Sequence, residues 1–133
     1  MNAFRPALAA FGLSLFLAAC AVVPGAPIVV GNPVAEGTPV AIDQPVRVGA
    51  VVVTPKQVVE DSRCPENARC VWAGRLIVRT RIDGAGWRDT ADITLGETYG
   101  THGHVVALVS GLPEKTAEAE TPAARYRFVY EAR

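Results

Sequence analysis

The chain of 133 residues has no net formal charge at neutral pH, because its 13 basic and 13 acidic residues cancel. Nucleic-acid-binding proteins usually carry a basic surplus, so the sequence predicts no nucleic-acid partner. Candidate catalytic residues are equally scarce. Neither Ser62 nor Ser110 lies in a G-x-S-x-G context, and no glycine-rich loop precedes a helix where it would hold phosphate. The sequence therefore predicts a protein that is not an enzyme and has no cofactor.

The sequence also lacks an apolar run long enough to cross a bilayer as a helix, which takes about 20 residues. Its apolar stretch near the start, Ala7–Ala19, is shorter and follows the basic residue Arg5. That arrangement is typical of an export signal peptide, so residues 1–19 are expected to direct export. Disulfides persist in the oxidising compartments that exported proteins reach.

The residues Leu17-Ala18-Ala19-Cys20 resemble the lipobox of bacterial lipoproteins. The resemblance implies that the signal peptide is cut before Cys20, whose thiol receives diacylglycerol and whose new amine is acylated. Three cysteines make one pair and one orphan, and lipidation accounts for the orphan. Ala21, rather than an aspartate, follows the cysteine, which for such lipoproteins favours the outer membrane. Two alternatives stay open: an ordinary signal peptide with Cys20 incidental, and a Cys20 bridge to another subunit.

Residues 20–45 differ in composition from the rest of the chain. Prolines and glycines recur at Pro24, Gly25, Pro27, Gly31, Pro33, Gly37, Pro39 and Pro45. Proline prevents a helix and disfavours a central strand, so we expect an extended, semi-rigid tether behind the lipidated cysteine. In the alternative, short apolar pieces such as Ile28-Val29-Val30 dock on the following domain as an edge strand.

Residues 46–133 show the alternating apolar pattern of β-strands almost throughout. Strands are expected at 46–53, 57–61, 71–82, 87–95, 105–109 and 126–131. Breaks or loops are expected at 54–56, 96–103 and 112–124, with a turn or two of helix at 114–120. Short strands separated by turn residues predict an all-β domain, a small antiparallel sandwich or barrel of about six strands.

Two of the three cysteines, Cys64 and Cys70, lie in one short stretch, where Pro65 favours a turn. A turn would bring their Cα atoms within the roughly 7 Å that a disulfide needs. We therefore expect a structural disulfide that staples the β-domain. A zinc site is the alternative, although zinc usually takes closer cysteine pairs and two further ligands.

Three residues near the cysteines are expected to have structural roles. Trp72 begins an apolar run and is expected to pack in the core against the disulfide, with stacking on a ligand as the alternative. Gly74 is expected to mark a bulge or a close backbone approach within a strand. Asp61 is expected either to pair with Arg63 or to cap turn amides.

Together these residues resemble a motif of small, mostly uncharacterised bacterial lipoproteins. The motif residues are Asp61, Ser62, Arg63, Cys64, Pro65, Cys70, Trp72 and Gly74. The resemblance extends from Val46 to the C-terminus and implies a small β-domain behind a lipid anchor, without indicating an activity. Arg75 departs from the pattern, which has an acidic residue soon after the glycine.

Two side-chain groups suggest ligands. His102 and His104 would point to the same side of an extended chain and are weak candidates for a metal site, whereas a solvated loop is the simpler interpretation. Arginines cluster in the middle of the chain at Arg63, Arg69, Arg75, Arg79, Arg81 and Arg88. They either bind an anionic envelope polymer or pair with nearby acids. The sequence thus predicts a lipid-anchored protein of the bacterial envelope that acts as a structural or binding module, with a metal-binding protein as the alternative.

Overall fold

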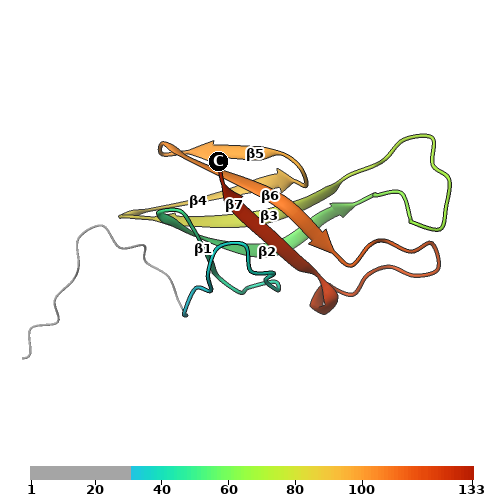
Figure 1. Ribbon diagram of the computed structural model, residues 1–133, viewed down its shortest axis with the longest axis horizontal. Helices are drawn as coiled ribbons and strands as arrows, with labels where there is room; N and C mark the ends of the chain where they lie inside the picture. Colours follow the sequence, from blue (N-terminus) through green and yellow to red (C-terminus); the bar gives the residue numbers. More distant parts are fainter. Residues whose placement is uncertain (1–30) are drawn as a thin grey trace, which may run out of the picture.

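The computed structural model describes residues 31–133, and these form seven strands in two antiparallel sheets (Figure 1). The expected signal peptide and Cys20 lie outside the described residues. The first sheet has the order β1-β2-β3-β4 and the second β5-β6-β7. The strands are β1 (Val46–Val48), β2 (Val51–Asp61), β3 (Leu76–Gly84), β4 (Trp87–Thr94), β5 (Thr98–Thr101), β6 (His104–Leu112) and β7 (Arg127–Ala132). The predicted all-β class is confirmed, and the domain is a small sandwich.

The core lies between the two sheets and follows the predicted alternation. In β3 the side chains of Leu76, Val78 and Ile82 are buried, together with that of Thr80. The Thr80 hydroxyl lies 2.9 Å from the hydroxyl of Tyr130 in β7, so one buried hydrogen bond joins the two sheets. Burial raises the pKa of Tyr130, which therefore stays protonated.

The first expected strand, 46–53, is instead two strands joined by a tight turn. Gly49 has a φ of +56°, a left-handed conformation that suits glycine, and there the chain reverses from β1 into β2. The expected break at 54–56 was also wrong, because β2 runs through Pro55. The pairing of β2 with β3 shifts register between Pro55 and Gln57, and a proline is tolerated at such a bulge.

Three further expectations need correction. The strand expected at 71–82 begins only at Leu76. The expected loop 96–103 contains β5, which pairs with β6 across a turn at His102 and Gly103. The expected helix at 114–120 is absent, and one 3-10 turn, Ala123–Arg125, is the helical segment of the described chain. The ends of these short elements depend on pairing with segments far away in the chain, which the local pattern of apolar residues does not predict well.

Residues 31–45, the described part of the expected tether, pack against the sandwich. Val40 is fully buried and exchanges two backbone hydrogen bonds of 2.9 Å with Phe128 of β7. The backbone amide of Arg47 in β1 donates to Val34 at 2.8 Å. We call residues 31–45 the strap, because they cover the outer edges of β1 and β7 and so join the two sheets along one side.

Glu36 of the strap strengthens this closure. Its carboxylate accepts the backbone N–H of Gly49 at 2.9 Å and that of Ala132 at 2.8 Å. These hydrogen bonds lower the pKa of Glu36 from its ordinary value, Ala132 contributing most. One ionised side chain thus links the β1–β2 turn to the end of β7.

Candidate functional site: the cysteine loop and the groove beside it

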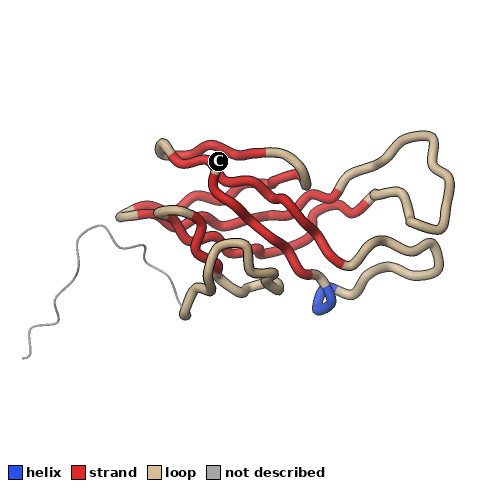
Figure 2. The backbone as a smooth tube through the Cα atoms, viewed as in Figure 1, coloured by secondary structure: helices blue, strands red, loops and turns tan. Residues whose placement is uncertain are grey.

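Two long loops extend from the same end of the sandwich (Figure 2). The cysteine loop, residues 62–75, joins β2 to β3, and the second loop, residues 113–126, joins β6 to β7. Cys64 and Cys70 form a disulfide with Cα atoms 5.8 Å apart, so the predicted staple is present. It closes a ring inside the cysteine loop.

The acid and base that precede the first cysteine pair with each other. Asp61 accepts two hydrogen bonds from the Arg63 guanidinium, at 2.8 and 3.0 Å, and a third at 2.7 Å from the hydroxyl of Tyr126. Arg63 also donates to the carbonyls of Gly111 and Pro113, at 2.8 and 3.1 Å. This cluster fastens the base of the cysteine loop to the start and the end of the second loop.

The electrostatics of the cluster keep both partners in one ionisation state. Burial raises the pKa of Asp61, but the hydrogen bonds from Arg63 and Tyr126 outweigh burial and hold it below its ordinary value. Burial, and then the bond to Asp61, raise the pKa of Tyr126 to about 12. Asp61 is therefore a carboxylate and Tyr126 a hydrogen-bond donor at neutral pH. Both are engaged in holding the loops together.

The two loops also touch nearer their ends. The backbone amide of Glu66 donates to the carbonyl of Lys115 at 3.0 Å. The side chain of Asn67 donates to Glu118 at 2.6 Å and accepts the amide of Ala117 at 3.1 Å. Because both polar atoms of the Asn67 side chain are used, this contact fixes how the loops lie against each other.

A tight backbone contact closes the neck of the cysteine loop. Ser62 donates its amide to the carbonyl of Arg75 at 2.8 Å, and its hydroxyl accepts the amide of Arg75 at 3.1 Å. Gly74 has a φ of +64°, and a Cβ there would lie 1.7 Å from the carbonyl oxygen of Ser62. The predicted close approach at Gly74 is confirmed, although it lies outside any strand.

Trp72 contradicts the expectation of a core tryptophan. Its side chain is 79% exposed, and that of Val71 is 97% exposed. Pairing of β2 with β3 ends at Asp61 and Leu76, so residues 71–75 lie beyond the sheet and have no facing layer on which to pack. The glycine between the tryptophan and the strand was the one local signal of this boundary.

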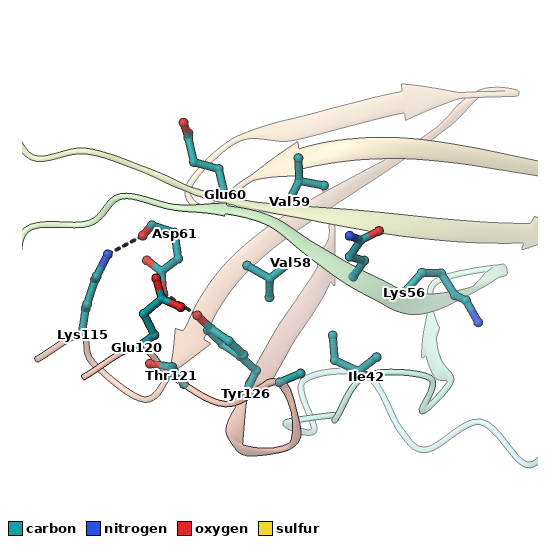
Figure 3. Close-up of a pocket in the computed structure, with 12 residues that line it drawn as sticks. Ile42, Lys56, Val58, Val59, Glu60, Asp61, Lys115, Glu120, Thr121 and Tyr126 are labelled. Atoms are coloured by element: carbon teal, nitrogen blue, oxygen red, sulfur yellow. Dashed lines mark hydrogen bonds between the residues drawn. The ribbon is translucent and has the colours of Figure 1, made fainter.

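A groove of about 460 Å³ runs beside the cluster (Figure 3). One wall is the segment of β2 from Lys56 to Asp61, which has no strand on its outer side because β1 pairs only with Val51–Val53. Ile42 of the strap completes the lining together with five residues of the second loop, Lys115, Glu120, Thr121, Ala123 and Tyr126. The open strand edge suits binding of an extended chain, although charged and apolar side chains alternate in the lining and the two bulges of β2 make that edge irregular.

The histidines lie elsewhere, at the β5–β6 turn. The ring of His102 stacks on Trp87 with centroids 4.0 Å apart, and the ring of His104 lies 5.9 Å from Trp87. Within residues 31–133 no group of three or more His, Cys, Asp or Glu side chains is placed to hold a metal ion. The role of this pair as metal ligands stays a prediction.

Most of the clustered arginines are paired with acids. Asp61, Glu60 and Asp92 pair with Arg63, Arg75 and Arg79, respectively, and the buried Asp83 pairs with both Arg81 and Arg88. Sequence reasoning missed Asp83, because only the fold shows that it is buried. Of the six arginines, Arg69 has no ion pair in the described part of the chain and lies exposed in the cysteine loop.

Comparison of the chain with protein-family models, curated proteins and solved structures finds no match. Across residues 31–133, no helix has the length and apolar character needed to span a membrane.

Proposed function

We propose that the chain is a lipid-anchored protein of the bacterial envelope whose β-domain is a binding module. The anchor rests on the lipobox-like sequence that ends at Cys20. The binding role rests on the cysteine loop, which is held rigidly while its apolar residues Val71 and Trp72 remain in solvent. Burying a large apolar side chain contributes about 1.5–3 kcal/mol to the stability of a fold. Leaving two neighbouring apolar side chains exposed therefore costs the domain a substantial stabilisation.

Rigidity distinguishes this loop from a loop that is merely exposed. Its disulfide, its neck and its contacts with the second loop hold the backbone before any partner arrives. A preformed surface loses little conformational entropy on binding, and tryptophan is enriched among residues that dominate binding energy. These properties favour a surface selected to present Trp72.

Intact mass spectrometry tests the anchor. Protein purified from membranes is expected to lack residues 1–19, to carry acyl chains on Cys20 and to offer no free thiol before reduction. Reduction and alkylation should then label Cys64 and Cys70 only. An unmodified Cys20 would contradict the anchor, whereas free thiols at the other two positions would contradict the disulfide.

Thermal unfolding tests whether the exposed residues serve binding rather than folding. The double variant Val71→Ser, Trp72→Ser should change the free energy of unfolding by no more than about 0.5 kcal/mol, as surface substitutions do. Trp87→Ser is the matched control, because Trp87 packs on His102 and against the core. An equal loss of stability in both variants would show that the loop residues are structural.

A further inference from the structure

The outer part of the cysteine loop, residues 68–73, which we call the tip, has an unusual composition. All six residues are exposed and none is acidic, and the apolar pair Val71 and Trp72 lies between Arg69 of the tip and Arg75 of the neck. Arg75 pairs with Glu60, whereas Arg69 forms no ion pair within residues 31–133. Tryptophan with flanking arginines is typical of segments that lie at the interface between a membrane and water.

The shape of the tip favours a lipid surface over a protein partner. The cysteine loop projects beyond the end of the sandwich, past the ends of β2 and β3 (Figure 1). A specific protein interface usually buries about 800 Å² on each partner, which two apolar side chains on a narrow loop do not supply. A bilayer interface accepts a small apolar projection and offers phosphates to the arginines.

The proposed anchor brings the tip within reach of the same membrane. Cys20 and Gly31 are eleven residues apart, a maximum span of about 36–40 Å. Gly31 lies beside Pro45, at the start of β1, and Val46 pairs with Val53 in β2. From Val53 along β2 to Cys64, whose amide donates to Ala73 beside Trp72, the chain covers at most about 36 Å, which the span from Cys20 to Gly31 can match. The domain can therefore rest with its anchor and its tip on one bilayer.

We propose that the tip of the cysteine loop inserts Val71 and Trp72 into the interfacial layer of the membrane that holds the lipid anchor. This inference rests on the proposed lipid anchor. A two-residue contact binds weakly by itself, but a tethered domain has a roughly millimolar effective concentration at the surface. The contact then sets the orientation of the domain, while the acyl chains supply its attachment.

Depth-dependent fluorescence quenching tests the inference on the full-length lipidated protein. The protein is reconstituted into vesicles of phosphatidylcholine and phosphatidylglycerol, with bromine atoms carried either near the headgroup or near the bilayer centre. Trp87→Phe leaves Trp72 as the sole tryptophan, and Trp72→Phe leaves Trp87 as the matched control. Each emission is compared with that of the same variant in vesicles without bromine, and thermal melting checks that both variants fold.

We expect shallow bromines to lower the emission of Trp72 about two-fold, and deep bromines to lower it less, as suits an interfacial residue. The emission of Trp87 should stay unchanged. Adding Arg69→Gln to the variant that retains Trp72 should weaken the quenching, and more in vesicles that contain phosphatidylglycerol than in phosphatidylcholine alone.

Flotation of the vesicles distinguishes a failure of tip insertion from a failure of the lipid anchor. If the protein floats but Trp72 is quenched no more than Trp87, the inference is wrong, the anchor stands, and a protein partner becomes the better explanation of the tip. If the protein does not float, the proposed anchor fails and the inference fails with it.

Discussion

Removing the hydroxyl of Tyr126 should weaken the junction between the two loops without disturbing the core. Tyr126→Phe keeps the ring that stacks on Phe128 and removes the 2.7 Å hydrogen bond to Asp61. A hydrogen bond to a charged group contributes about 1.5–3 kcal/mol, and the lower end suits this partly buried pair. We therefore expect a loss of about 1.5 kcal/mol, which lowers Tm by roughly 6–12 °C in a domain of this size.

Tyr99→Phe is the matched control, because Tyr99 also donates to an aspartate, at 2.9 Å to Asp89. Tyr99 is less buried than Tyr126, and Thr101 also donates to Asp89, at 2.7 Å, so this contact depends less on the tyrosine. Loss of the Tyr99 hydrogen bond should therefore change Tm far less than loss of the Tyr126 hydrogen bond. Equal changes in the two variants would refute the view that the cluster of Asp61, Arg63 and Tyr126, rather than any Tyr–Asp contact, holds the loops.

The same variant should show a characteristic pH dependence. Because the folded-state pKa of Asp61 is lowered, its contribution to stability is fully present above about pH 4, the ordinary aspartate pKa. It is lost as the pH falls through the folded value. The stability difference between the parent and Tyr126→Phe should accordingly shrink below pH 4, as urea titrations at several pH values would reveal. A difference that grows in acid would contradict the assigned ionisation.

Three further changes probe the remaining contacts. Gly74→Ala forces a Cβ into a backbone carbonyl and should lower the free energy of unfolding by much more than about 1 kcal/mol. The control, Gly86→Ala, should lower it by roughly 1 kcal/mol, because Gly86 has a similar positive φ but open space around it. Thermal melts compare the two variants, and similar losses of stability would argue against the tight neck. Cys64→Ser should lower stability by about 2 kcal/mol without releasing the protein from membranes, and an unchanged Tm would argue against the bridge. Glu36→Ala should speed hydrogen exchange at the backbone amides of Gly49 and Ala132, which donate to this carboxylate. Exchange in the centre of β3 is the reference. Unchanged exchange at the two amides would show that the strap closes without Glu36.

Much of the architecture was predictable because its causes are local. The alternation of Leu76, Val78 and Ile82 with exposed partners indicates which face of β3 is buried, whatever lies opposite. The short spacing of Cys64 and Cys70 permits their bridge. The Asp61–Arg63 pair likewise joins residues two positions apart.

The candidate site was less predictable, since it is assembled from segments that are far apart in the chain. Trp72 follows the apolar pattern of a strand, and only the end of the β2–β3 pairing shows that it lies beyond the sheet. Pro55 predicts a break in the strand, yet β2 continues through it because the register shifts by a bulge between Pro55 and Gln57. No local signal marks Tyr126 as the partner of Asp61, which lies 65 positions earlier.

The β class, the buried faces of the strands and the lipobox resemblance could be inferred from the sequence, because each depends on residues within a few positions of one another. The spacing of the two cysteines made their disulfide the expected outcome, and the structure confirms it. Three features are visible only in the folded molecule: the strap closes the sandwich, the second loop braces the cysteine loop, and Val71 and Trp72 remain in solvent. The physical reason is that burial and edge pairing depend on which distant segments pack together. No short window of sequence reports that.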